Sequence, residues 1–186
     1  MVYAAFEELN TDRLRLRKFY RTDAENFFRF AGSASVTKFM LWNPHANVAE
    51  SAASIEKSLS RYENGRYYRW AVALQENDTL IGIIDLLGFD EARNTCSFAY
   101  MLAEDHWGRG FGPEALKAVL DFAFRELKVS AVEADHFAEN AASGAVMRKV
   151  GMQYCGTIPE KYEKDGITYH APQYRMTVEE RNHTVS

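Results

Sequence analysis

The chain has 186 residues, of which 47% are hydrophobic and 13% aromatic, so it can bury a core and does not have the composition of a disordered chain. Its formal net charge is −4 at pH 7, and a chain without a basic excess is not expected to bind nucleic acid. It has neither the uninterrupted run of about 18 apolar residues that a membrane-spanning helix needs nor a signal-peptide pattern. The two cysteines, Cys96 and Cys155, lack the spacing of a disulfide framework or a metal site. We expect one cytoplasmic domain over residues 1–186, with no metal and no membrane partner.

The first predicted element is a strand in which arginine and leucine alternate. Residues 11–18 have a period of two, which places Leu14 and Leu16 on the face opposite to the arginines. The other face carries Arg13, Arg15 and Arg17. A row of like charges is more common on a solvated face than at an anion site. We therefore expect these arginines to face solvent and to be dispensable for activity.

Two helices and an antiparallel meander are predicted next. Thr22 or Asp23 can cap a short helix rich in phenylalanine, and Asn47 can cap a longer helix that ends at residues 64–65, an Asn-Gly pair. Strands joined by polar turns are then predicted over residues 68–74, 80–87 and 95–103. The first half of the chain is thus strand, helices and meander.

The second half is predicted to contain two helices and three further strands. The first helix has apolar residues at helical spacing from Leu116 to Leu127, with Pro113 at its first position. The predicted strands cover residues 130–137, 153–158 and 168–178, with a charged hairpin at 161–166. The second helix, over 140–149, is predicted to face inward with Ala142, Ala145, Val146 and Val150 and to end at Gly151. Residues 179–186 are expected to fray. The fold class expected is a single mixed α/β (α+β) domain.

A glycine-rich segment precedes the first of these helices. Residues 106–114 read His-Trp-Gly-Arg-Gly-Phe-Gly-Pro-Glu, and glycine allows backbone conformations that a Cβ would obstruct. The unpaired N–H groups and the positive dipole end of the following helix point back at this segment, which favours a phosphate group there. A Walker A loop is excluded because no Lys-Ser/Thr follows. A dinucleotide site, with Asp135 as the ribose-binding acid, and a turn without a ligand remain alternatives.

Three segments together resemble a known family. Residues 100–115 resemble the acetyl-CoA-binding motif of the GNAT N-acetyltransferase superfamily, in the branch of the ribosomal-protein N-terminal (alanine/serine) acetyltransferases. Residues 139–152 are similar to the Asn-x-x-Ser helix of that branch, and residues 11–17 to its first strand. The resemblance covers about residues 9–178. It implies a mixed, mostly antiparallel sheet that is flanked by helices and splayed where the cofactor enters.

The resemblance also implies which residues bind acetyl-CoA (coenzyme A). The strand that ends at Leu102 would pair with the pantetheine arm, and Asn140 and Ser143 would lie near the sulfur. Asn140 can bond the pantetheine amides, cap the helix that follows it, or do both. The pyrophosphate would be held by the backbone N–H groups of the segment Trp107, Gly108, Arg109, Gly110, Phe111 and Gly112. We expect the Trp107 indole to pack beneath this segment. The Arg109 side chain would either contact the phosphates or lie at the surface.

Candidate catalytic residues follow from the same resemblance. Ser143 is the expected proton donor to the departing thiolate; alternatively, its hydroxyl only bonds a helical carbonyl. The glutamate that many relatives carry as base has no counterpart around Ser97. Glu160 is the candidate base, with a solvated charge as the alternative, and His136 can relay a proton through water. Neither cysteine has a motif position, so no covalent intermediate is expected.

The function expected is acetyl transfer from acetyl-CoA to a primary amine by direct transfer in a ternary complex. A peptide or protein N-terminal α-amine is the preferred acceptor, since its pKa of about 7.7–8.0 leaves part of it neutral, against about 10.4 for lysine. A small amine (a polyamine, an amino acid or an aminoglycoside) and a non-catalytic acyl-CoA-binding module are the alternatives. The acceptor site could be walled by the aromatic residues Phe39, Trp42, Tyr162 and Tyr169. Both a monomer and a homodimer are compatible with the sequence.

Overall fold

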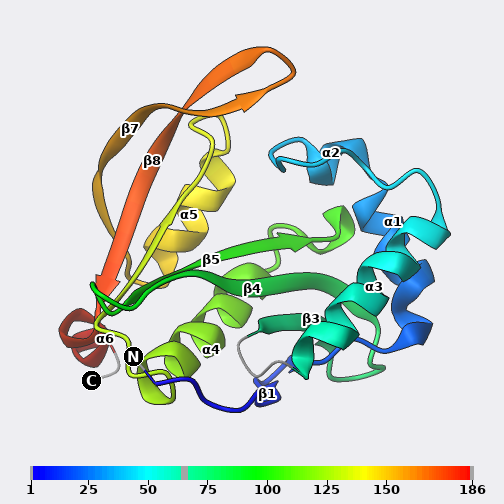
Figure 1. Cartoon of the computed structure of the whole chain (residues 1–186), viewed down its shortest axis with the longest axis horizontal. Coiled ribbons are helices and arrows are strands. Elements are labelled where there is room, and N and C mark those ends of the chain that lie inside the picture. The colour runs from blue at the N-terminus through cyan, green and yellow to red at the C-terminus, as the bar shows by residue number, and fades with distance from the viewer. Residues whose placement is uncertain (1, 64–66, 185–186) are drawn as a thin grey trace.

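A computed structural model describes residues 2–63 and 67–184 of the chain. It contains one eight-stranded sheet with helices on both faces (Figure 1). The strands are β1 (Leu9–Asn10), β2 (Leu14–Arg17), β3 (Tyr68–Leu74), β4 (Leu80–Asp90), β5 (Thr95–Leu102), β6 (Ala131–Asp135), β7 (Gln153–Lys164) and β8 (Ile167–Thr177). The helices are η1 (Arg21–Asp23), α1 (Ala24–Ala31), α2 (Ala34–Thr37), α3 (Val48–Tyr62), η2 (Glu104–His106), α4 (Phe111–Arg125), α5 (Ala141–Lys149) and α6 (Val178–Thr184).

The sheet is antiparallel except at its centre. Its strand order is β1-β2-β3-β4-β5-β6-β8-β7, and only β5 and β6 pair in parallel. That parallel pairing joins residues 95–97 to residues 131–133, whereas β5 continues to Leu102. Beyond Ser97 the two strands diverge, and α5 lies in the angle between β5 and the β7–β8 hairpin (Figure 1). This confirms the predicted mixed, splayed sheet. We call the opening between β5 and β6 the split.

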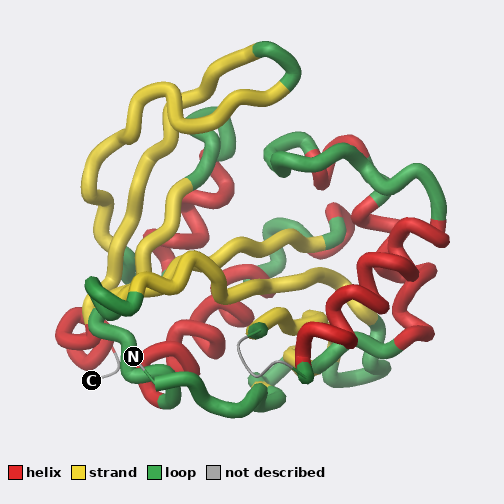
Figure 2. Tube along the Cα trace, in the orientation of Figure 1, coloured by secondary structure: helices red, strands yellow, loops and turns green. Residues whose placement is uncertain are grey.

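Two apolar cores lie on the two faces of the sheet. Helices α1 and α3 cover one face, with Phe30 and Ile55 packed against Ile83 of β4. Helix α4 covers the other face, where its residues Leu116 and Val119 are fully buried. Fully burying one such side chain stabilises the fold by about 1.5–3 kcal/mol. Figure 2 shows the resulting arrangement, with the sheet strands in yellow between helices in red.

Helix ends that depend on short-range hydrogen bonds are placed as predicted. Asp23 occupies the N-cap position of α1 without a side-chain capping bond, and the Asn47 side chain accepts a hydrogen bond from the backbone N–H of Glu50 (3.1 Å) at the start of α3. Gly151 follows α5 with a φ of 93°, the left-handed conformation typical of a helix stop. The predicted end of α3 at residues 64–65 lies outside the described residues.

Several boundaries differ from the prediction. Helix α4 begins at Phe111 with Gly110 as its N-cap, so Pro113 is its third residue rather than its first. The expected frayed tail contains α6 instead, and Arg181 of this helix bonds to Asp121 of α4. The strands β7 and β8 extend almost to the turn at residues 165–166, which shortens the predicted hairpin.

The predicted inner face of α5 is right for Val150, which is buried, and for Val146, which packs against the core, but it is wrong for the two alanines. Ala142 and Ala145 are exposed, whereas Ser143, Gly144 and Met147 are buried. A Cβ on Gly144 would lie 2.7 Å from Nε2 of His136, so the helix needs glycine at this contact. The periodicity of the apolar residues misled the prediction because this helix packs through small residues.

The predicted solvated face of the first strand is also wrong for Arg17. Its side chain is 1% exposed and forms an ion pair with Asp23 (2.8 Å), which is also buried. Nε of Arg17 also donates to Asp78 (3.0 Å). Two carboxylates from different turns thus satisfy one buried guanidinium, and a charge that is buried in this way requires such partners.

Asp23→Asn is expected to lower the free energy of unfolding by about 3 kcal/mol, because it removes one carboxylate from a buried arginine. The measurement is the urea unfolding midpoint. The control is Glu56→Gln, which breaks the exposed Arg21–Glu56 pair (2.6 Å) and should cost less than about 1 kcal/mol. Equal effects of the two substitutions would contradict the structural role of the Arg17 pair.

No helix among the described residues is long and apolar enough to cross a membrane.

Candidate active site

The open edge of β5 presents backbone groups to the split. The N–H of Ala103 donates to Ile81 of β4 (2.8 Å), so the peptide groups of residues 101 and 99 also face β4. Alternate residues of a strand direct their N–H and C=O groups to opposite edges. The N–H groups of Leu102 and Tyr100 therefore point into the split. A polar ligand that enters the split can pair with this edge.

The glycine loop, residues 107–112, connects η2 to α4. Gly108 (φ 70°) and Gly110 (φ 84°) both have left-handed backbone conformations, which favour glycine. No side chain caps α4, and the hydrogen bonds of the described chain include none donated by a backbone N–H of residues 108–112. These donors lie at the positive end of a helix of 15 residues, so the loop has the chemistry of an anion site.

Trp107 ties the start of the glycine loop to the end of β5. Its indole Nε1 donates to the carbonyl of Leu102 (2.8 Å), and the residue is 48% exposed. The indole therefore lies at the surface and not beneath the loop, in contrast to the prediction. The Leu102 carbonyl is occupied by this bond, which leaves the Leu102 N–H as the free group.

The loop is also held by Arg13, which the sequence placed on a solvated face. Nη1 of Arg13 donates to the carbonyl of Arg109 (3.0 Å), and Nε donates to Glu114 of α4 (2.7 Å). The side chain of Arg109 lies over the Phe111 ring, with 5.2 Å between the guanidinium carbon and the ring centroid. Arg13 is thus solvent-exposed, as predicted, but its guanidinium also contacts the glycine loop and α4.

Helix α5 places Asn140 and Ser143 next to the open edge of β5. Oδ1 of Asn140 accepts from the backbone N–H of Ser143 (3.3 Å), so Asn140 is the predicted N-cap, and its amide NH₂ donates to no group among the described residues. Ser143 is 9% exposed, and its Oγ accepts a hydrogen bond from the Tyr100 hydroxyl of β5 (3.4 Å). The described hydrogen bonds include none from this Oγ to a helical carbonyl. Its proton is thus available to a ligand.

Tyr100 is a site residue to which the sequence analysis assigned no role. Burial raises the pKa of its hydroxyl, although the bond to Ser143 acts in the opposite direction. The hydroxyl therefore keeps its proton at neutral pH and stays a donor. The only sequence signal was its place at the start of the motif, two residues before Leu102.

Of the two other acid–base candidates, His136 packs against α5 at Gly144, the residue after Ser143, whereas Glu160 lies on β7. Glu160 is exposed on the edge strand β7, in a bulge with a φ of 51°, and its backbone N–H donates to His170 (3.1 Å). His136 is 8% exposed; its Nδ1 contacts the Phe137 carbonyl (2.7 Å), and its Nε2 is buried without a partner. Within the described chain, neither side chain forms a hydrogen bond or an ion pair with Ser143 or the glycine loop.

A cavity of about 330 Å³ opens on the face of the sheet that α1 and α3 cover. We call it the aromatic cavity, because Trp42 and Phe27 both contact His45, with centroids 5.3 and 5.4 Å apart. Burial lowers the pKa of His45. The cavity extends to residues 99–101 of β5, the stretch whose other edge forms the split. Of the predicted acceptor aromatics, Trp42 lines it, whereas Phe39, Tyr162 and Tyr169 pack against Phe137.

Asp85 is the only carboxylate among the described residues that line the aromatic cavity. Arg69 binds it through two hydrogen bonds, of 2.6 and 2.9 Å. Although burial lowers the pKa of Arg69, the bonds to Asp85 raise it above its ordinary value. Arg69 therefore stays charged and offsets the acidic side chain that it binds, so the cavity is aromatic and holds no unpaired acidic group among the described residues.

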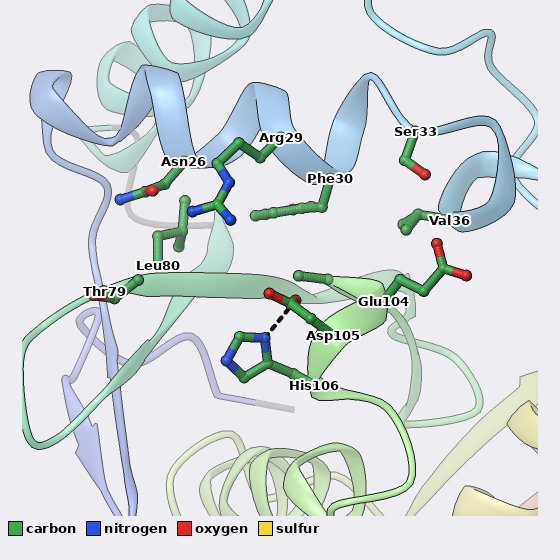
Figure 3. Close-up of a pocket in the computed structure, with 11 residues that line it drawn as sticks. Asn26, Arg29, Phe30, Ser33, Val36, Thr79, Leu80, Glu104, Asp105 and His106 are labelled. Atoms are coloured by element: carbon green, nitrogen blue, oxygen red, sulfur yellow. Dashed lines mark hydrogen bonds and ion pairs between the residues drawn. The ribbon is translucent and has the colours of Figure 1, made fainter.

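The described residues form two more cavities, of which the second is lined in part by Gly110 of the glycine loop. One, of about 380 Å³, lies between α1 and η2, where Arg29 projects from α1 and His106 lies on the other side, bonded to Asp105 (2.7 Å; Figure 3). The other, of about 270 Å³, lies at the start of α4. Lys117 and Lys149 line it together with Gly110, so positive charge gathers where the loop meets the helix.

Comparison with known proteins identifies the family. The model of the acetyltransferase (GNAT) domain matches residues 13–153. The chain is 29% identical to the uncharacterized N-acetyltransferase p20 of Bacillus licheniformis, over 85% of this chain and 88% of the relative. It is 27% identical to the uncharacterized N-acetyltransferase YoaA of Bacillus subtilis, over 92% and 97%. Spermidine N(1)-acetyltransferase of Vibrio cholerae is 20% identical over 83% of this chain and 87% of its own length.

Solved structures share the fold. A GNAT-family acetyltransferase from Bacillus anthracis superposes with a TM-score of 0.83 at 21% identity, covering 93% of this chain and 99% of its own. RimL, a ribosomal-protein alpha-N-acetyltransferase solved with coenzyme A, gives 0.81 at 16% identity, covering 94% and 99%. The split sheet and the glycine loop thus occur in a chain that matches the domain model over most of its length. The chain belongs to the GNAT family of acetyltransferases.

Proposed function

We propose that this protein transfers an acetyl group from acetyl-CoA to a primary amine. The observation that carries the proposal is the row of unpaired N–H groups at residues 108–112 beside the open edge of β5. A diphosphate can accept hydrogen bonds from these N–H groups, and an extended amide chain can pair with the open edge of β5. Coenzyme A contains both groups. The structure of RimL with coenzyme A supports the same assignment.

The cofactor-binding residues are assigned from this geometry. Gly108 and Gly110 expose backbone donors to the diphosphate, and a Cβ on Gly108 would meet no protein atom within 4 Å, so the space beside it is open. Lys117 and Lys149 supply positive charge to further phosphate groups. Along the pantetheine arm, the Leu102 N–H and the Asn140 amide are the free polar groups.

Ser143 is assigned as the proton donor. Acetyl-CoA supplies an activated acetyl thioester. As the neutral amine nitrogen bonds to the acetyl carbon, the carbon–sulfur bond breaks. The sulfur takes up a proton, and the amine releases one to solvent water. The Ser143 hydroxyl can donate the proton that the sulfur takes up, since its Oγ accepts from Tyr100, which can replace it. The N–H of Leu102 is the candidate donor to the thioester oxygen.

An α-amine of a peptide or protein is the acceptor class that the aromatic cavity favours. A polyamine carries several positive charges and needs free carboxylates, but Asp85 is already neutralised by Arg69. An α-amine is partly neutral at pH 7, because its pKa is about 7.7–8.0. An α-amine therefore depends less on a general base. This fits the position of the candidate base Glu160, which lies on an exposed edge strand.

The proposal is tested by following the release of free thiol from acetyl-CoA with a panel of peptides, spermidine and small amines. Thiol release with a peptide, together with a mass increase of one acetyl group, is the expected result. Binding of acetyl-CoA without turnover of any amine would favour an acyl-CoA-binding module. Turnover of spermidine but not of peptides would contradict the α-amine assignment.

Gly110→Val is expected to weaken acetyl-CoA binding at least tenfold, because a β-branched residue is strained at a φ of 84° and displaces the loop donors. Calorimetry gives the dissociation constant. The control is Gly166→Val at the β7–β8 turn, where φ is 74° and a Cβ meets no atom within 4 Å. Equal affinity of the Gly110 variant and the wild type would refute the loop assignment.

Ser143→Ala is expected to lower kcat by at least about tenfold, the smaller end of a general-acid effect, and to change the affinity for acetyl-CoA by less than about twofold. Tyr100→Phe should act in the same direction. Ser60→Ala is the matched control, because this exposed serine bonds only a carbonyl within α3. An unchanged kcat for the Ser143 variant would exclude it as the donor.

Only one of the two thiols should react with a disulfide reagent in the native protein. Burial raises the pKa of the Cys96 thiol to about 12, whereas Cys155 is exposed. We expect one reactive thiol in buffer, two in denaturant and none in native Cys155→Ser, which should keep its acetyltransferase activity. Loss of activity in that variant would indicate a covalent route through sulfur.

A further inference from the structure

Arg13 joins the N-terminal strand to the glycine loop across 96 residues of sequence. It lies just before β2, and its Nη1 reaches the carbonyl of Arg109 (3.0 Å). Nε and Nη2 both contact Oε2 of Glu114 (2.7 and 2.6 Å), and its backbone N–H donates to Oε1 of the same residue (3.0 Å). Thr11 adds a hydroxyl donor to Oε1 (2.5 Å). Both carboxylate oxygens of Glu114 thus bind this segment.

The bond to Arg109 fixes the orientation of a loop peptide. A trans peptide is planar, and its C=O and N–H groups point in opposite directions. Because the Arg109 carbonyl faces Arg13, the N–H of Gly110 faces away from Arg13. A Cβ on Gly110 would lie 3.4 Å from Nη2 of Arg13, so the loop backbone and the guanidinium are in close contact. The Phe111 ring, 4% exposed, supports the guanidinium at 4.4 Å.

Arg13 also cancels a charge that opposes an anion. Glu114 lies in the first turn of α4, near the unpaired loop donors. Burial alone would raise the pKa of Glu114, but the hydrogen bonds from Thr11 and Arg13 hold it below the ordinary value, so the group is ionised at neutral pH. An unpaired carboxylate here would repel a bound diphosphate, and the two contacts from Arg13 neutralise it.

We propose that Arg13 and Glu114 are positioning residues, which hold the glycine loop in the conformation that binds the diphosphate of acetyl-CoA. This inference rests on the proposed function. It assigns to Arg13 two effects: it orients the Arg109–Gly110 peptide, and it neutralises Glu114 at the start of α4. Neither residue touches the reacting atoms.

A purely structural ion pair is the competing explanation, and the chain contains a matched control for it. Arg15, two residues further along, pairs with Glu8 (2.9 Å) at similar exposure: the arginine side chains are 36% exposed in this pair and 47% in the Arg13 pair. Among the described residues, the Arg15 side chain pairs with Glu8 and Asp78 and forms no hydrogen bond or ion pair with the glycine loop. Arg13→Gln and Arg15→Gln therefore remove the same charge from the same segment.

The test compares two acetyl donors. In Arg13→Gln we expect kcat/KM for acetyl-CoA to fall about tenfold, the size of one charge-assisted hydrogen bond, through KM and not through kcat. For S-acetylpantetheine, which lacks the diphosphate, kcat/KM should stay within about twofold of the wild type. Arg15→Gln should change neither value. Equal losses for the two donors, or an unchanged KM for acetyl-CoA, would overturn the inference.

The double variant Arg13→Gln/Glu114→Gln separates charge from geometry. Once Glu114 is neutral it no longer repels the diphosphate, so the double variant should recover part of the affinity lost by Arg13→Gln, without reaching that of the wild type. No recovery would refute the neutralising role. Urea unfolding midpoints show that each variant is folded under the assay conditions.

The proposed function and this inference fail in different ways. If the wild type neither binds nor uses acetyl-CoA, the proposed function is wrong. If the wild type uses acetyl-CoA and Arg13→Gln matches Arg15→Gln, only the positioning role is wrong.

Discussion

The parallel pairing of β5 and β6 is short, and the rest of the site depends on that shortness. Pairing stops at Ser97, so the last residues of β5 keep one free edge inside a folded domain. Buried backbone groups without partners are costly, and this cost favours a ligand that pairs with them. Helix α5 lies in the opening and brings Ser143 to Tyr100, so the gap that admits a ligand also carries the candidate acid.

The glycine loop is anchored at two points by side chains that donate to main-chain carbonyls. Trp107 bonds to Leu102 at the end of β5, and Arg13, just before β2, bonds to Arg109. Both bonds use acceptors and leave the loop N–H groups free. An anion site needs donors that are held in place before the ligand arrives, because ordering them at binding would cost affinity. The two bonds hold the loop in place and leave its N–H groups available to the ligand.

Features that depend on a few neighbouring residues were predictable. The caps at Asn47 and Asn140 and the stop at Gly151 follow from side-chain and φ preferences within one helical turn. The three strands of the meander and the glycine loop followed from alternation and from glycine spacing. The family resemblance correctly implied the splayed sheet, and the structure places Asn140 and Ser143 beside its opening.

Features that depend on distant partners were not predictable. Arg13, Arg15 and Arg17 look equivalent in the alternating pattern, yet one holds the glycine loop, one pairs at the surface and one is buried between Asp23 and Asp78. The three arginines have different contacts because their partners lie about 60 to 100 residues away or in another turn. Periodicity carries no information on such contacts. Local chemistry therefore specifies the helices, the strands and the anion-binding loop. The neighbours that each charge meets are set only when the sheet and helices pack together.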